Sequence, residues 1–248
     1  ISCLISLTGI AIVLTPRGLI PRWPGLLLFL IILTPVKELK EGDLRLTFLD
    51  VGQGLSVLLE TAHRFQLYDT GPTFGATFSA ARQMVIPSLQ HSGGSVVDHL
   101  IISHKDNDHA GGLPDILEKV PVGRIILYDE CGREWVSDNV KFRTFSALAS
   151  HPGMLTSEND RSCLLSIRTH GFHVLLTGDI EAKAEYALLN EGSGTVDVMS
   201  VPHHGSSSSS TPALLNRLKP KLAVVSSGFQ NRFNHPDPVV LERYRKRS

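Results

Sequence analysis

Residues 103–112 read SHKDNDHAGG and place two histidines and two aspartates between an apolar run and a glycine pair. The apolar run predicts a buried strand, so the polar residues follow at the loop where this strand gives way to a helix. His104, Asp106 and Asp108 alternate, and alternate side chains of an extended backbone point to one side. Together with His109 they can converge on a divalent cation such as zinc, manganese or iron. A single aspartate would suffice to cap the next helix, so the pattern favours a metal site over a capped turn.

The composition is that of a globular protein without a global charge. The chain has 248 residues, of which 42% are hydrophobic, and this is enough for one large α/β domain or two small ones. Basic and acidic residues number 24 each, so any contact with a polyanion has to be local. Cys3, Cys131 and Cys163 are odd in number and in no CxxC pattern, which predicts neither a disulfide framework nor a thiolate metal site. We expect Cys163 to be a small core residue.

The first 36 residues have the composition of a membrane segment. Two apolar runs are separated by PRGLIPRWP, and no acidic residue precedes Glu38. Each run is shorter than the roughly 20 residues of a spanning helix, so we expect residues 1–36 to be membrane-associated, with residues 37–43 as a linker. The alternative is a buried hairpin of the following domain. The chain starts on Ile and ends on RYRKRS, which suggests a fragment of a longer polypeptide.

From residue 44 to residue 248 the pattern alternates between strands and helices, which predicts a layered α/β domain with helices outside. The expected strands are 44–52, 55–61, 64–71, 96–103, 124–129, a pair around Gly171, 195–202 and 222–228. The expected helices are 76–89, ending near Pro87, then 113–120, 180–190, 211–218 and 236–247. Residues 129–160 read as irregular.

Three further polar motifs follow apolar runs. Asp179 ends the strand LLTGD, where it can cap the next helix, bind a metal, or do both. His203 and His204 end the strand in VPHHGS, and a histidine pair at such a place favours a metal or catalytic role. His235, in NRFNHPDP, is a weaker candidate, because a loop histidine before proline is more often structural or exposed.

The ordered motifs resemble those of one protein family. LTFLDVGQGLSVLLE, YDTG, SHKDNDHAGG, ENDRSCLLSI, LLTGD, VPHHGS and SSGFQNRFNHP are similar to the soluble domain of the ComEC family of DNA-internalisation competence proteins, over residues 43–240. That domain is of the metallo-β-lactamase superfamily, whose usual first motif is HxHxDH. The resemblance implies a four-layer αββα sandwich with its metal site on strand-end loops between two sheets.

The resemblance also implies a role for each motif residue. His104 and Asp106 would serve one metal, Asp108 and His109 the other, and Asp179 would bridge them. One of His203 and His204 would complete the second site, and the other would face the substrate. Asp50 and Asp69 would tie strand-end loops together rather than bind metal.

Two departures from the family pattern bear on the metal. Asp106 stands where a second histidine is usual, and ENDRS stands where a third histidine is expected. The loss of two imidazoles favours manganese, with zinc or magnesium as alternatives. Asn159 or Asp160 is either a weak oxygen ligand or a turn residue.

The function implied is hydrolysis, by two ions about 4 Å apart, of the DNA strand that does not enter the cell. Asp108 or Asp179 would orient the water, and the spare histidine or His235 would protonate the leaving oxygen. Ser206–Ser210 would either contact phosphate or form a flexible linker. Candidate contacts to single-stranded DNA are Lys105, Arg161, Arg232 and the terminal Arg243, Arg245, Lys246 and Arg247.

Two other functions stay open at this point. One is hydrolysis of a small ester, thioester or lactam, and the other is a non-catalytic domain that binds DNA and gates the channel. A domain that degrades incoming DNA should lie on the outer face of the inner membrane, although the positive charges around the apolar runs give no orientation.

Overall fold

The computed structural model describes residues 2–16, 21–30, 38–75, 77–147, 157–190 and 194–247. The chain divides into two compact units, Ile1–Glu38 and Leu39–Ser248. The first unit contains α1 (Ser2–Leu14) and α2 (Trp23–Leu30). Neither these helices nor any others in the described ranges are long and apolar enough to cross a membrane. The membrane association of residues 1–36 stays a prediction.

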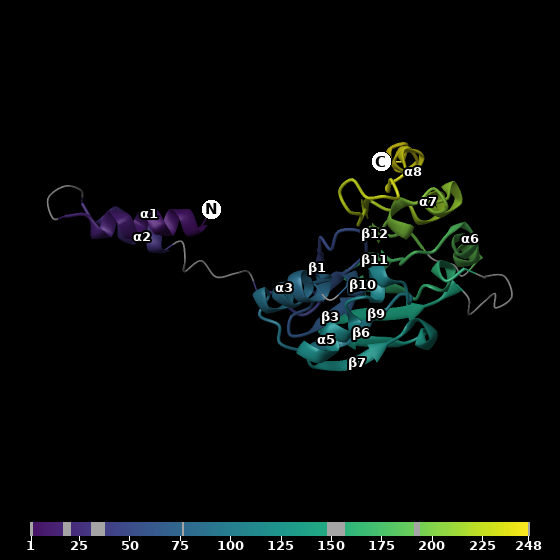
Figure 1. Ribbon diagram of the computed structural model, residues 1–248, viewed down its shortest axis with the longest axis horizontal. Coiled ribbons are helices and arrows are strands. Elements are labelled where there is room, and N and C mark those ends of the chain that lie inside the picture. The colour runs from purple at the N-terminus through teal and green to yellow at the C-terminus, as the bar shows by residue number, and fades with distance from the viewer. Residues whose placement is uncertain are drawn as a thin grey trace. The chain divides into compact units, whose positions relative to one another are not determined.

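Two sheets form the second unit (Figure 1). The strands of the first sheet, in the order β1-β2-β3-β6-β7, are β1 (Arg45–Phe48), β2 (Val57–Glu60), β3 (Phe65–Tyr68), β6 (Val97–Ile101) and β7 (Val122–Ile126). The strands of the second sheet, in the order β13-β12-β11-β10-β9-β8, are β8 (Glu134–Ser137), β9 (Val140–Phe145), β10 (Leu164–Thr169), β11 (Phe172–Leu176), β12 (Val198–Ser200) and β13 (Leu222–Val224). In each sheet one half is parallel, β3-β6-β7 in the first and β11-β12-β13 in the second. A small hairpin of β4 (Thr73–Phe74) and β5 (Phe78–Ser79) stands apart.

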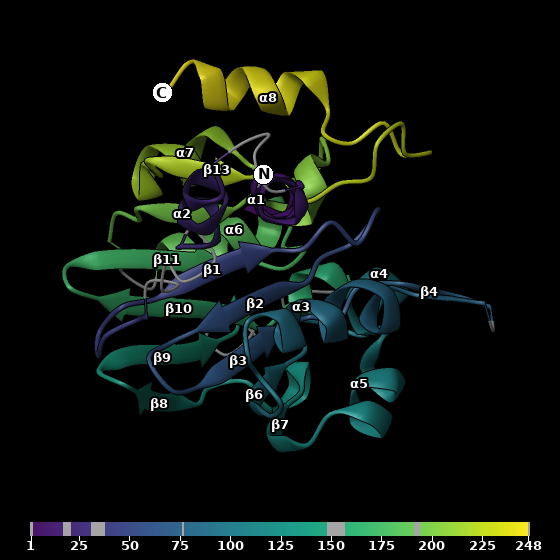
Figure 2. The ribbon, with the colours of Figure 1, turned by 90° about the vertical axis from the view of Figure 1, so that its left-hand side faces the viewer.

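The helices lie outside the two sheets. They are α3 (Ile86–His91), α4 (Asn107–Ala110), α5 (Leu113–Lys119), α6 (Ala182–Asn190), α7 (Pro212–Leu218) and α8 (Pro238–Arg245). Figure 2 shows β1, β2 and β3 in front of β9, β10 and β11, so the sheets are stacked face to face.

Three apolar cores lie between the four layers of the domain. Successive strand residues point to opposite faces, so Val57 and Leu59 of β2 pack between the sheets whereas Leu58 packs on the helical side. The core under α3 and α5 contains Leu89 and Ile116, and the core under α6 and α7 contains Leu188 and Leu214. The predicted αββα architecture is confirmed for the domain.

The prediction that residues 129–160 are irregular is wrong, because β8 and β9 form a hairpin there. Its two turn residues, Asp138 and Asn139, both have positive φ, as a two-residue turn between right-twisted strands requires. Along β9, Val140 and Phe142 are buried whereas Lys141 and Arg143 are exposed. The alternation along β9 was visible in the sequence. The hairpin was missed because its two turn residues include no glycine, which is the usual signal of such a turn.

The predicted helix 76–89 is wrong at both ends. Its first part belongs to the β4–β5 hairpin, and the helical segment begins with a π turn at Ala81–Val85 that runs into α3. Pro87 lies in the first turn of α3 instead of ending a helix. Proline is tolerated there because the first-turn N–H groups have no helical partner.

The expectation of no disulfide is also wrong. Cys131 and Cys163 are joined, with Cα atoms 5.7 Å apart and a sequence separation of 32. Cys131 precedes β8 and Cys163 precedes β10, and both contribute to the core between the sheets. Cys163 is fully buried as expected, but as half of a cross-link.

Candidate metal centre

The predicted motif residues gather at one edge of the sandwich, where parallel strands end. The loop after β6 carries His104 and Asp106, and α4 carries Asp108 and His109. Asp179 follows β11 in the second sheet, and His203 and His204 follow β12. The carboxyl ends of neighbouring parallel strands meet at the same edge of a sheet, which is why motifs about 70 to 100 residues apart come together there.

Asp108, His109, Asp179 and His204 form a compact cluster. Each offers one ligand atom, and these four atoms all lie within 4.8 Å of one another. The Nε2 atom of His109 is 3.0 Å from Oδ1 of Asp179 and 3.1 Å from Nε2 of His204. The Nε2 atom of His204 is 3.3 Å from a carboxylate oxygen of both Asp108 and Asp179. Two nitrogens bound to one tetrahedral zinc-sized ion lie about 3.4 Å apart, so these residues fit a divalent cation.

A second group of ligand atoms shares Asp179. The Nε2 atom of His104 is buried without a hydrogen-bond partner and lies 4.0 Å from Oδ2 of Asp179. Oδ2 of Asp106 lies 3.7 Å from the same nitrogen, and Nε2 of His203 lies 3.9 Å from Oδ2 of Asp179. An unpartnered buried nitrogen is rare in native proteins, and here it points toward carboxylates. Asp179 therefore stands between two sets of ligand atoms, in the position of a bridge.

The imidazoles are held in place from behind. Nδ1 of His109 is 2.8 Å from Oδ2 of the fully buried Asp69. Asp69 also accepts hydrogen bonds from the backbone N–H and the hydroxyl of Ser103, both at 2.7 Å. Nδ1 of His204 donates to the carbonyl oxygen of Ser226 at 2.7 Å. Each contact leaves Nε2 facing the cluster, as the outer partners of metal-binding histidines do.

The carboxylates of the cluster favour protonated His109 and His204 when no cation is bound. Burial opposes ionisation of Asp179, but His109 and His204 lower the pKa of its carboxyl well below the usual value. Burial likewise opposes a charge on His204, yet Asp179 and Asp108 raise its pKa to about 9. The pKa of His109 is raised well above the usual value by Asp179 and Asp69, against the effect of burial. A cation binding here must displace these protons.

The pKa of His104 is shifted in the opposite direction. Burial, and after it the neighbouring His109, lowers the pKa of its imidazole. The ring is therefore neutral near pH 7 and its free nitrogen lone pair is available to a cation.

Comparisons with known proteins bear on the family and fold of the chain. Residues 49–145 match the family model of the metallo-beta-lactamase superfamily. The chain is 36% identical to Competence protein ComA of Neisseria gonorrhoeae over 246 residues, 94% of this chain and 34% of that protein. It is 35% identical to Recombination protein 2 of Haemophilus influenzae, over 88% of this chain and 29% of that protein. It is 29% identical to ComE operon protein 3 of Bacillus subtilis, over 89% of this chain and 33% of that protein.

The chain is a homologue of competence proteins. It spans about a third of the length of these relatives. The resemblance predicted from the ordered motifs is thereby confirmed.

Solved structures agree on the fold. A putative metal-dependent hydrolase from Parabacteroides distasonis is similar with a TM-score of 0.51 and 13% identity, over 82% of this chain and 91% of that one. CmlA beta-hydroxylase is similar with a TM-score of 0.51 and 13% identity, over 80% of this chain and 49% of that one. The domain thus has the metallo-beta-lactamase fold, a fold of metal-dependent hydrolases.

The structure separates the two histidines of the VPHHGS motif in this competence-protein homologue. Both adopt positive φ, at 49° and 55°, which turns their side chains in different directions. His204 is buried in the cluster, whereas the His203 side chain is 20% exposed at its rim. Nδ1 of His203 lies 3.3 Å from a carboxylate oxygen of Glu181, a residue that sequence reasoning missed. Glu181 comes two residues after Asp179, and that proximity was its only signal.

His235 lies outside the cluster but beside its rim. Its ring centroid is 5.7 Å from that of His203 and 5.7 Å from that of Phe233, on which it stacks at 24°. The guanidinium of Arg232 covers the Phe233 ring at 4.7 Å. Burial, together with His203 and His204, lowers the pKa of His235. A stacked column of Arg232, Phe233 and His235 thus runs from an exposed loop to His203, which the His235 ring meets edge-on at 74°.

Several other predicted site residues have structural partners. Oδ1 of Asp50 accepts from the backbone N–H of Gly52 within one turn. Oδ1 of Asp160 accepts from the backbone N–H of Glu181, which ties the loop before β10 to the loop after β11. The Asn159 amide lies 3.5 Å from Nε2 of His203 at the rim.

The serine stretch is ordered. Ser209 and Ser210 are fully buried, and the Ser209 hydroxyl donates to the carbonyl oxygens of Pro202 and Ser206. The flexible-linker interpretation is therefore wrong.

Many of the basic residues predicted to contact DNA form ion pairs or hydrogen bonds within the domain. Lys105 pairs with Glu158 at 3.0 Å. Arg243 donates to the carbonyl oxygens of Ser209 and Ser210, Lys246 pairs with Glu242, and Arg247 donates to Asn216. The contacts of Arg243 and Arg247 anchor the C-terminal segment to the domain.

Proposed function

We propose that this domain is a divalent-metal-dependent phosphodiesterase that hydrolyses a DNA strand during DNA uptake. The observation that carries the proposal is the shared carboxylate, because Asp179 lies between the ligand atoms of His109 and His204 and the unpartnered Nε2 of His104. With Asp106 and Asp108 the site has three carboxylates. This oxygen-rich set favours manganese, with zinc or magnesium as alternatives, and two bound ions.

The residues of the site have different roles in the proposed hydrolysis. Bound cations supply Lewis acidity at the phosphodiester and lower the pKa of a water molecule. Asp108 and Asp179 accept hydrogen bonds from this water and orient it. The water oxygen would attack phosphorus and pass a proton to one of these carboxylates, while the bond from phosphorus to the leaving sugar oxygen would break and that oxygen would take a proton from a histidine.

We assign the proton donor for the leaving oxygen to His203 rather than to His204. His204 is buried among the ligands, whereas His203 is partly exposed and is oriented by Glu181. His235, whose pKa is lowered, is neutral near pH 7 and lies against His203. It therefore serves as a positioning residue for His203, whereas the sequence left either the spare histidine or His235 as the donor.

Side chains at the rim of the cluster support the proposal of a single-stranded substrate. The column of Arg232, Phe233 and His235 offers flat groups on which an unpaired base can stack beside the cluster. Phe229, on the same loop, is 93% exposed. The competence-protein relatives are consistent with a DNA substrate.

The disulfide supports a place outside the cytoplasm. Disulfides persist in oxidising compartments and are rare in the reducing cytosol. The Cys131–Cys163 link thus supports the outer face of the inner membrane for this domain, with residues 1–36 associated with that membrane.

The activity is tested on the purified chain with a 5′-labelled single-stranded oligonucleotide and with manganese, magnesium or zinc. Cleavage that requires a divalent cation supports the proposal. Hydrolysis of a lactam or thioester without oligonucleotide cleavage would favour the small-ester alternative, and no hydrolysis with any of the three metals would favour a non-catalytic domain.

A further inference from the structure

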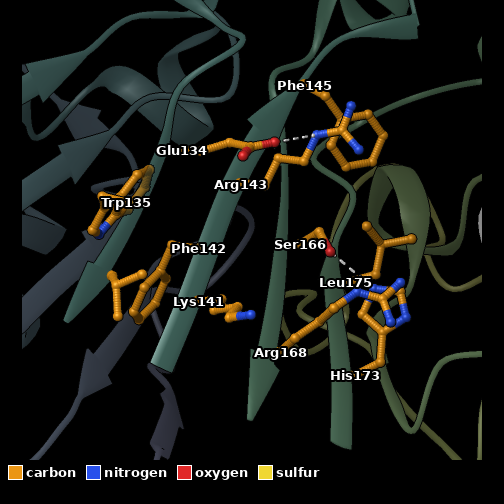
Figure 3. A pocket seen from close by; sticks show the side chains of 11 residues that line it. Glu134, Trp135, Lys141, Phe142, Arg143, Phe145, Ser166, Arg168, His173 and Leu175 are labelled. Carbon is orange, nitrogen blue, oxygen red and sulfur yellow. Dashed lines mark hydrogen bonds and ion pairs between the residues drawn. The ribbon is translucent and has the colours of Figure 1, made fainter. Parts of the chain in front are cut away.

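A hollow with a strongly basic lining lies on the second sheet, away from the metal ligands. Its volume is about 520 Å³, and strands β8 to β11 line it (Figure 3). None of the metal-centre residues lines it. Its charged lining residues are Lys141, Arg143 and Arg168, against the single acid Glu134.

The sheet register places two cations directly opposite each other. Lys141 of β9 is the cross-strand partner of Arg168 of β10, and Arg168 is in turn the partner of His173 of β11. Like charges directly opposite in a sheet are destabilising. Within the described ranges neither Lys141 nor Arg168 forms an ion pair, and Glu134, the acid of the lining, pairs with Arg143.

His173 adds no balancing charge to this row. Its Nδ1 lies 3.0 Å from the carbonyl oxygen of Thr195, and its Nε2 lies 2.9 Å from the Ser166 hydroxyl, as dashed in Figure 3. Because the carbonyl accepts only from an N–H, Nε2 is the free lone pair to which Ser166 donates. The row across three strands therefore carries two positive charges and no negative charge.

Arg143 presents a flat guanidinium in the same hollow. It lies 5.5 Å above the Phe145 ring centroid, and its Nε is 3.2 Å from Glu134 on β8. These two contacts hold the guanidinium plane over the ring. A guanidinium plane held in this way is a surface on which an unpaired base can stack.

We propose that this hollow binds the phosphodiester backbone of a single nucleic-acid strand, at a site separate from the metal centre. Lys141 and Arg168 contact phosphates, and Arg143 stacks beneath a base. An anion placed between the facing cations removes their mutual repulsion, which accounts for an arrangement that is unfavourable in isolation. A single strand suits a hollow of this size, and a basic sheet face with flat groups is a known platform for such strands.

The test measures binding without cleavage, so it is independent of the proposed hydrolase activity. A fluorescein-labelled oligothymidylate is titrated with the full chain in EDTA, and fluorescence anisotropy is followed at several salt concentrations. The variant is Lys141→Ala with Arg168→Ala. Its matched control is Lys119→Ala with Arg124→Ala, the same charge change on α5 and β7 of the other half of the domain.

We expect weaker binding in the first variant only. For single strands each neutralised phosphate contributes roughly 0.7 to the slope of log affinity against log salt, so loss of two contacts lowers the slope by about 1.4. Lys141→Glu separates folding from binding, because it creates an ion pair with Arg168 across the strands. This variant should melt no lower than the native chain and still bind the oligonucleotide less tightly.

Three results would overturn the proposal. In the first, the hollow variants bind the oligonucleotide as the native chain does. In the second, the control loses as much affinity and slope as the hollow variant, which would show a bulk charge effect. In the third, the hollow variants lose binding only to vesicles containing an anionic phospholipid, which would assign the surface to a membrane.

Discussion

The Nε2 atoms of His109 and His204 point at each other across 3.1 Å, although the two residues are 95 positions apart in the chain. Two imidazole nitrogens at this distance can bind one cation together. Asp179 lies 3.0 Å from the first nitrogen and 3.3 Å from the second, which makes this pair the centre of the proposed metal site.

Replacement of the carboxylate behind His109 should weaken metal binding without removing a ligand. Asp69→Asn removes the charge that accepts from Nδ1 of His109 at 2.8 Å, so the ring loses its orientation and basicity. We expect metal affinity to fall roughly 10- to 100-fold, measured by titration calorimetry. Asp50→Asn is the control, because the Asp50 carboxylate accepts from Gly52 in its own turn and lies outside the cluster. Equal affinity in the native and Asp69→Asn chains would contradict an orienting role.

The metal-free and metal-bound domains should respond to pH in opposite directions. The pKa of His204 is raised from 6.5 to about 9, so its pairing with Asp179 stabilises the metal-free domain fully below pH 6.5 and is lost as the pH approaches 9. A cation needs the imidazole neutral, so metal affinity should rise over this interval, by up to about tenfold per pH unit for each proton displaced.

Thermal melting at several pH values, with and without metal, measures both trends. The metal-free melting temperature should fall from pH 7 to pH 9 while the stabilisation by metal grows. His91→Gln, at the exposed end of α3, should leave both trends unchanged. A metal-induced shift that does not vary with pH would argue against proton displacement.

Loss of the disulfide should destabilise the domain. Cys131→Ala with Cys163→Ala opens a cross-link with a sequence separation of 32, and loop-closure entropy predicts a loss of about 4 kcal/mol of unfolding free energy. Guanidinium denaturation measures this loss, and a reductant should reproduce it in the native chain. Cys3→Ala is the control. A native chain that is indifferent to reductant would show that the link does not form.

The stacked side chains at the rim should contribute to the binding of DNA strands but not of small substrates. Phe233→Ala removes a ring that contacts Arg232 and His235, and loss of one stacked base costs about 1–3 kcal/mol. We expect the KM for a single-stranded oligonucleotide to rise roughly 5- to 150-fold. Hydrolysis of bis(p-nitrophenyl) phosphate, which has no base, should be unchanged. Phe172→Ala, on an exposed ring of β11, should alter neither, and an unchanged KM in Phe233→Ala would refute base stacking.

Much of the site could be predicted from the sequence because strand ends are local features. His104, Asp108, Asp179 and His204 each follow an apolar run, and parallel strands bring such ends to one edge. The choice between His203 and His204 could not be predicted, since it depends on two positive φ values within one turn.

Features that depend on pairing between distant segments could not be predicted from the sequence. The Cys131–Cys163 link depends on how the loop after β7 meets the start of β10, and the Lys141–Arg168 row depends on strand register. Glu181 was missed because only the folded loop brings its carboxylate to His203.

Metal content and strand cleavage, measured on the same samples of three chains, test the central claim most directly. After manganese loading and removal of excess metal, elemental analysis should find two ions in the native chain, one in His104→Ala, and fewer than one in Asp179→Asn, since Asp179 serves both sets of ligands. Cleavage of a single-stranded oligonucleotide should fall with metal content and be absent in Asp179→Asn. A native chain without bound metal, or an Asp179→Asn chain that cleaves like the native one, would contradict the account.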